Sequence, residues 1–88
     1  MKIVWDEPKR IANLDKHGLD FAALDVDFFY GATVLPAKVG RLKAIGSLDD
    51  EIVSIIFMPL GREALAIISM RPAGKSEKRQ LYGKTKTS

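Results

Sequence analysis

The feature of this sequence that most constrains its fold is the shortness of the connections between four apolar runs. The runs occupy residues 33–39, 41–47, 52–58 and 64–70. The connections centre on Gly40, on Asp49 with Asp50, and on residues 60–62. A parallel pair of strands needs a crossover of about a dozen residues or more, which these connections do not provide. Consecutive runs are therefore predicted to pair as an antiparallel meander, with the nearly continuous apolar run at 52–58 as a buried central strand.

Before these strands the pattern changes to helical spacing. Residues 3–5 are a short strand candidate for one edge of the sheet. Asp6 can then cap a helix that ends at Gly18, a residue that readily closes helices. Ile11 and Leu14, three residues apart, are predicted to form the apolar stripe of this helix.

A second, shorter helix is predicted between Asp20 and Gly31. Phe21, Leu24 and Phe28 recur at helical spacing and would share its inner face. These elements predict an α+β fold in which the helices are segregated from the strands.

The end of the chain predicts a third helix and carries most of the positive charge. Residues 75–84 favour a helix with Leu81 and Tyr82 as candidates for facing the sheet, and residues 84–88 are expected to fray. The complete expectation is one domain over residues 1–88, with two N-terminal helices, a four-stranded antiparallel meander and a basic C-terminal helix.

The net charge of +3 is unevenly distributed. Residues 1–70 contain eight basic and ten acidic side chains, whereas residues 71–88 contain six basic side chains and one acidic. A basic end on a mildly acidic body favours contact with phosphate or with an acidic protein. A solvated tail is the alternative that charge alone leaves open.

Composition also argues against several classes of protein. The chain has no cysteine and only one histidine, so neither a disulfide framework nor a zinc cage is expected, and no metal or other cofactor is predicted. Phosphate-binding glycine loops and nucleophile elbows are absent from the sequence. No apolar run is long enough to cross a bilayer, and the first ten residues do not resemble an export signal, so a cytoplasmic location is expected.

The candidate chemistry lies where the last strand meets the basic helix. Arg71, Glu77, Arg79 and Tyr82 combine cations, a carboxylate and a phenol, and Lys75 adds a further cation. Cleavage of RNA without a metal requires a base for the 2′-OH, cations for the phosphate and an acid for the leaving oxygen. The same residues would also suit a solvated helix. On the chemistry of the side chains alone, this alternative is favoured over a catalytic site.

A series of short motifs runs along the chain in a characteristic order. They are WDEPK at 5–9, Asn13, KHG at 16–18, Phe21 with Ala22, Arg41 with Gly46, and ISMRPA at 68–73 followed by Lys75, Glu77, Arg79 and Tyr82. In this combination, over residues 3–82, the sequence resembles the BrnT family of toxins. The resemblance implies a RelE-like ribonuclease fold and the toxin of a bacterial type II toxin–antitoxin pair. It also implies metal-independent RNA cleavage that inhibits translation and growth.

The resemblance further implies a partner and a set of site residues. The partner would be a BrnA-like antitoxin with a ribbon-helix-helix DNA-binding region, bound in a hetero-oligomer. The catalytic candidates are Arg71 and Arg79 as phosphate contacts, Glu77 as base or orienter, Tyr82 as a positioning group and His17 as an acid or base. Lys16, Arg41 and Lys75 are the expected RNA-binding residues.

Three positions depart from the family pattern: Gly40, Ala66 and Met70. A bulky Met70 beside Arg71 would either crowd the proposed site or pack into the core. These departures keep open a degenerate toxin that retains only antitoxin binding, as well as a non-catalytic RNA-binding or regulatory domain. A protein-interaction module with a basic face is a third class of function.

Overall fold

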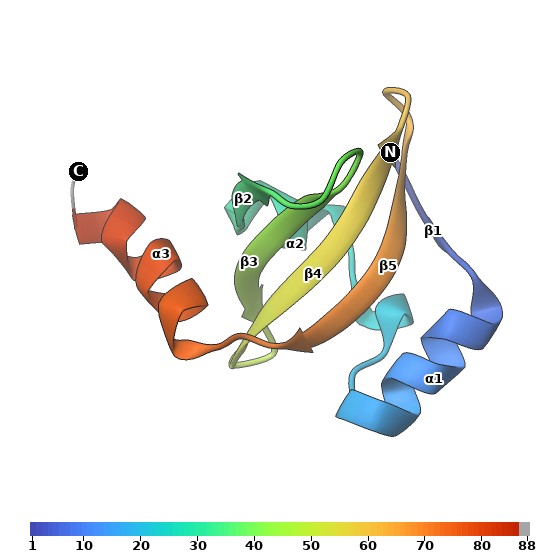
Figure 1. The fold of residues 1–88 in the computed structure, drawn as a ribbon, viewed down its shortest axis with the longest axis horizontal. Helices are drawn as coiled ribbons and strands as arrows, with labels where there is room; N and C mark the ends of the chain where they lie inside the picture. Colours follow the sequence, from blue (N-terminus) through green and yellow to red (C-terminus); the bar gives the residue numbers. More distant parts are fainter. Residues whose placement is uncertain (87–88) are drawn as a thin grey trace.

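The meander predicted from the short connections forms the body of the sheet (Figure 1). The structure is a computed structural model that describes residues 1–86. Neighbouring strands pair antiparallel in chain order, with these bounds: β2 Thr33–Pro36, β3 Leu42–Leu48, β4 Glu51–Leu60 and β5 Ala64–Pro72. The α+β class and the meander are confirmed.

The sheet has one strand more than the four predicted. The strand candidate at the start of the chain is β1, Lys2–Trp5, and it pairs parallel to β5 at the edge of the sheet. The strand order is β1-β5-β4-β3-β2. Parallel pairing is possible here because all the chain between β1 and β5 serves as the crossover. The long strand β4 therefore lies at the centre, as its apolar sequence predicts.

The first helix, α1, spans Glu7–His17 and has the predicted ends. The Asp6 carboxylate accepts a hydrogen bond from the Lys9 N–H, and Gly18 adopts the left-handed conformation with φ of 70°. Its predicted apolar stripe is wrong, because Ile11 and Leu14 are 55% and 38% exposed. The helix presents these side chains to solvent.

The buried residue of α1 is instead a polar one, Asn13. Beyond the pair Trp5–Ile67, β1 no longer covers the edge of β5. Asn13 Oδ1 accepts a hydrogen bond from the Met70 N–H at 3.1 Å, and its Nδ2 donates to the Leu19 carbonyl at 3.2 Å. A side-chain amide thus takes the place of a strand partner, which explains why a polar residue faces the sheet.

The predicted second helix is divided in two. A 3-10 turn, η1, covers Phe21–Ala23, and α2 covers Val26–Gly31. Leu24 between them is extended, and Asp25 caps α2 by accepting from the Phe28 N–H at 3.0 Å. A second capping residue inside the pattern therefore starts a new helix. The three residues predicted to share the inner face, Phe21, Leu24 and Phe28, are all buried.

The main core lies on the face of the sheet that η1 and α2 cover, behind the strands in Figure 1. From the strands it contains Ala44, Val53, Ile55, Phe57, Ile67 and Met70. Met70 is fully buried there and pairs with Ile55 across the strands. Its bulk therefore packs in the core on the face opposite to its neighbour Arg71.

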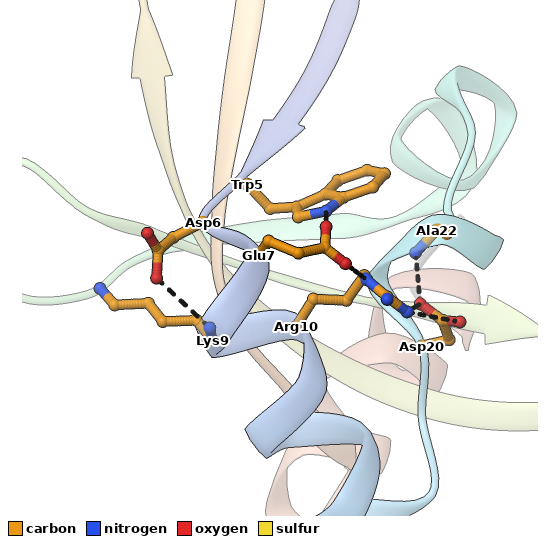
Figure 2. A network of polar contacts seen from close by, with 7 residues as sticks. All are labelled: Trp5, Asp6, Glu7, Lys9, Arg10, Asp20 and Ala22. Carbon is orange, nitrogen blue, oxygen red and sulfur yellow. Dashed lines mark hydrogen bonds and ion pairs between the residues drawn. The ribbon is translucent and has the colours of Figure 1, made fainter.

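A network of polar contacts joins β1, α1 and η1 (Figure 2). The Trp5 indole N–H donates to Glu7 at 3.0 Å, and Glu7 forms an ion pair with Arg10. Arg10 reaches both carboxylate oxygens of Asp20 at 3.2 Å, and Asp20 accepts from the Ala22 N–H at 2.9 Å. The WD motif thus has a structural use, because it fixes the first helix against the segment that covers the core.

The last helix, α3, spans Lys75–Lys86. Residues 87 and 88, part of the predicted frayed end at 84–88, lie outside the described residues. In the part of the chain that the structure describes, no helix is long and apolar enough to cross a membrane.

Candidate active site

The face of the sheet opposite to the main core (the open face) is turned toward the viewer in Figure 1. It carries two rows of side chains that belong to the candidate site. Residues paired across β3, β4 and β5 share a face. One row is Ile45, Ser54 and Arg71, and the next is Lys43, Ile56 and Ser69. The first turn of α3 returns to this face and brings Glu77 over it.

Glu77 is the centre of a hydrogen-bond cluster although it is only 5% exposed. Arg71 donates two hydrogen bonds to it, from Nη1 to Oε1 at 2.8 Å and from Nη2 to Oε2 at 2.7 Å. The Lys43 Nζ lies 2.9 Å from Oε2, and the Ser54 hydroxyl donates to the same oxygen at 3.1 Å. The Gly74 N–H donates to Oε1 at 2.9 Å. The buried carboxylate is therefore fully paired.

These contacts set the charge state of Glu77. Burial on its own would raise the pKa of this carboxyl group, because it disfavours the charged form. The hydrogen bonds from Arg71, Gly74, Lys43 and Ser54 outweigh burial and lower the pKa from 4.5 to about 2. Glu77 is consequently ionised at every physiological pH and is a weak proton acceptor.

The cluster retains an excess positive charge that solvent can reach. Arg71 and Lys43 contribute two positive charges and Glu77 contributes one negative charge. The Arg71 side chain remains 44% exposed although both of its terminal nitrogens contact Glu77. The Glu77 carboxylate thus holds a guanidinium and an ammonium side by side on the open face, which is an arrangement suited to a phosphate.

Two residues of this cluster were absent from the sequence-based set, namely Lys43 and Ser54. Each carried a signal in the sequence. Lys43 is the one charged residue within β3, and Ser54 is the one hydroxyl in the apolar run of 52–57. A lone polar residue in a buried strand usually has a buried partner, and that partner is Glu77.

The other candidates on α3 lie away from this cluster. Successive residues of a helix are about 100° apart, so Arg79 points about 200° from Glu77 around the axis. Arg79 and Lys75 are exposed, and Tyr82 is 52% exposed. Of the two candidates for facing the sheet, Leu81 is half-buried and Tyr82 is exposed. The structure brings together Arg71 and Glu77, while Arg79, Lys75 and Tyr82 form an outer surface.

The remaining candidates line two separate depressions that share residues of β5, beyond the end of β1. Lys16 and His17 line a depression on the α1 side, together with Lys9, Ile68 and Ser69. Arg41 lines a second depression on the open face, again with Ile68 and Ser69. Basic side chains from α1 and from the β2–β3 loop thus flank the same two residues of β5. This proximity between distant parts of the chain is not visible in the sequence.

Among the residues that the structure describes, no three histidine, aspartate or glutamate side chains converge as metal ligands would.

A comparison with protein families matches residues 5–77 to the model of BrnT, described as the ribonuclease toxin of a type II toxin–antitoxin system. The chain belongs to the BrnT family. The matched region includes Arg71 and Glu77 and ends before Arg79 and Tyr82. Membership makes the protein a ribonuclease toxin of a type II toxin–antitoxin system, as the ordered motifs predicted.

A solved structure supports the same assignment. The crystal structure of the Brucella abortus ribonuclease toxin BrnT superposes with a TM-score of 0.81 at 55% sequence identity. The alignment covers 85% of this chain and 99% of the Brucella chain. The search of curated proteins found no match. The sheet with its parallel β1–β5 edge is therefore a BrnT-like structure.

Proposed function

We propose that this BrnT-family chain cuts RNA without a metal ion, at the cluster formed by Arg71, Lys43 and Glu77. The observation that carries the proposal is the pair of hydrogen bonds from Arg71 to the Glu77 carboxylate, together with the ion pair of Lys43 with the same carboxylate. It presents two oriented cations with a net positive charge on an open sheet face. A phosphate that gains negative charge during attack by a ribose 2′-OH would be stabilised there.

The reaction would form a bond between the 2′ oxygen and phosphorus and break the bond to the 5′ oxygen. The 2′-OH loses a proton, and the leaving 5′ oxygen gains one. The products would be a 2′,3′-cyclic phosphate and a 5′-hydroxyl end. Arg71 and Lys43 would bind the non-bridging oxygens throughout this exchange.

Of the two proposed roles of Glu77, base and orienter, its lowered pKa and its contacts with Arg71 and Lys43 favour the orienter. A general base works best when its pKa lies near the working pH, whereas the pKa of Glu77 is about 2. Glu77 would instead position Arg71 and Lys43. His17 stays the proposed acid or base, and Tyr82 stays a proposed positioning group at the outer surface.

RNA would approach over the basic side chains around the β5 edge. Lys16 from α1 and Arg41 from the β2–β3 loop lie on its two sides, and Lys75 and Arg79 extend the positive surface along α3. Phosphate contacts of this kind attract a single strand with little regard to its sequence.

The test is cleavage of a purified RNA transcript in EDTA by the wild type and by Arg71→Ala. We expect the wild type to cut and the variant to be at least about a hundredfold slower, because one oriented transition-state donor contributes roughly that factor. Arg62→Ala, which removes an exposed arginine from the β4–β5 turn, is the matched control and should cut normally. Intact RNA with the wild type, or equal cutting by Arg71→Ala, would contradict the proposal.

The expected partner is a BrnA-like antitoxin with a ribbon-helix-helix region, and the expected setting is the cytoplasm. An antitoxin that inhibits by capture would cover the exposed cations of α3 and be attracted by them. Co-expression tests this. Neutralisation that survives the combined loss of Lys75 and Arg79 would show that the antitoxin binds elsewhere.

Salt-dependent RNA binding without any product would instead identify a non-catalytic RNA-binding domain. A protein that neither binds nor cuts RNA but still captures the antitoxin would be a degenerate toxin.

A further inference from the structure

The β2–β3 loop and the edge of β5 enclose a hollow of about 190 Å³ on the open face of the sheet. Its lining residues are Ala37, Lys38, Arg41, Ile56, Ile68 and Ser69. It is smaller than the roughly 300–1,000 Å³ of sites that hold drug-sized ligands. Its size suits a single flat ring system.

The lining has an apolar floor and a cationic rim. Ile56 and Ile68 offer aliphatic surface, and the exposed Lys38 and Arg41 stand on the loop. Ser69 adds a hydroxyl that can donate or accept a hydrogen bond. An apolar slot bounded by cations and a hydroxyl matches a nucleobase, with its flat faces, polar edge and neighbouring phosphates.

A hydrogen-bonded loop and a β-bulge form the two sides of the hollow. In the loop, the Ala37 N–H donates to the Arg41 carbonyl at 3.1 Å and the Arg41 N–H donates to the Lys38 carbonyl at 2.8 Å. On the opposite side, β5 carries a bulge where the register with β4 shifts between Ile56 and Phe57. Ile68 is the extra residue of β5 at this bulge. Bulges redirect side chains next to functional sites, and this one lies in the wall of the hollow.

The hollow adjoins the cluster of Arg71, Lys43 and Glu77. Ile56 and Ser69 share their row with Lys43, and the next row contains Ser54 and Arg71. Rows on one face are about 6–7 Å apart, because they are separated by two residues of about 3.3 Å each. A ribose and its phosphate can span that separation.

We propose that this hollow receives one nucleobase of a single-stranded RNA whose neighbouring phosphate lies against Arg71 and Lys43. This inference rests on the proposed function, and it adds a base-binding site to the phosphate-binding cluster. Base binding at this place would give the toxin a preference for the nucleotide beside the cut. Phosphate contacts alone cannot supply such a preference.

The test fills the hollow and measures what bases contribute to binding. Ala37 is exposed, so Ala37→Phe can occupy the hollow without disturbing the core. Val39→Phe places the same side chain in the same loop at a fully exposed position outside the lining. The probes are short labelled 2′-O-methyl RNA, which cannot be cut by 2′-OH attack, and the same strand without bases. Thermal unfolding confirms that both variants fold.

We expect the wild type and Val39→Phe to bind the strand with bases about tenfold more tightly than the abasic strand. In Ala37→Phe this ratio should fall close to one, while the affinity for the abasic strand stays unchanged. An equal ratio in all three proteins, or no preference for bases in the wild type, would overturn the inference.

Cleavage of ordinary RNA is scored separately in the same proteins. A wild type that prefers bases through the hollow but leaves RNA intact would keep the base site and refute the proposed cleavage. If the wild type cuts RNA and Ala37→Phe has the same binding ratio as the wild type, the proposed cleavage stands and the base site is refuted.

Discussion

Glu77 shows how a single carboxylate links stability to the arrangement of the site. Its folded-state pKa of about 2 lies below the value of 4.5 expected in the unfolded chain. The stabilisation it provides is therefore fully present above about pH 4.5 and is lost as the pH falls toward 2. A shift of this size corresponds to roughly 3 kcal/mol of unfolding free energy.

Glu77→Gln should accordingly lower the stability at neutral pH, and urea unfolding measures the difference. The difference in unfolding free energy between the wild type and the variant should decrease as the pH is lowered from about 5 to 2. Glu63→Gln, which alters an exposed carboxylate in the β4–β5 turn, serves as control. A gap that stays constant with pH would show that Glu77 is not held in its ionised form by its partners.

Gly46 illustrates a residue whose role in the motif is steric. A Cβ atom at this position would lie 3.0 Å from the Phe28 ring and 3.2 Å from the Ala32 Cβ. Gly46→Ala should therefore destabilise the protein by about 1–3 kcal/mol, since the packing of α2 on β3 has no room for it. Gly83→Ala in α3 meets no atom within 4 Å and should be neutral or stabilising. Equal thermal unfolding midpoints for the two variants would contradict this account.

The individual residues of the site were only partly predictable. Arg71 and Glu77 were identified from the basic end of the chain and the family motifs. Lys43 and Ser54 were missed because their partner is distant in the sequence, and only the sheet register brings them together. Arg79 and Tyr82 share the basic helix with Glu77 but not its inward direction.

At the level of the elements, α1 is the one whose packing the sequence pattern describes wrongly. Its apolar residues are exposed, and Asn13 binds the uncovered edge of β5. Helical periodicity assumes that a helix packs through apolar side chains. Here the sheet edge offers backbone N–H groups, and an amide satisfies one of them better than an apolar side chain could.

Asn13→Ala should therefore destabilise the fold by about 1–3 kcal/mol, because it leaves the buried Met70 N–H without an acceptor. Leu14→Ala, on the exposed side of the same helix, should have a much smaller effect. Urea unfolding of both variants measures the difference. If Leu14→Ala lowered the unfolding free energy more than Asn13→Ala, the apolar stripe would be the packing surface of α1 and this account would be wrong.

The β-strands were more predictable than the helices, since the lengths of their connections restrict the possible pairings. The parallel placement of β1 beside β5 has no such local signal. It depends on contacts between the strands that come first and last along the chain. The division of the second helix was signalled by Asp25, a capping residue inside an otherwise helical pattern.

Across the whole molecule, the positive charge is distributed more widely than the sequence arithmetic suggests. Counting residues places the excess after residue 70, yet Lys16 and Arg41 from the acidic body lie on both sides of the β5 edge. Folding thus adds two separate basic segments to the one that is visible in the sequence. RNA affinity should consequently depend on residues from three regions of the chain.

Salt dependence measures this shared surface directly. Removing one cation that binds a phosphate of single-stranded RNA should reduce the slope of log affinity against log salt by about 0.7. Lys16→Ala and Arg41→Ala should each reduce the slope by about this amount, and the double variant should show about twice the reduction, because the two side chains lie in separate depressions. Lys2→Ala, at the far end of β1 from this edge, should leave the slope unchanged. Unchanged slopes for all the variants would confine RNA binding to α3 and Arg71, and a change confined to Arg41→Ala would place the strand on the open face alone.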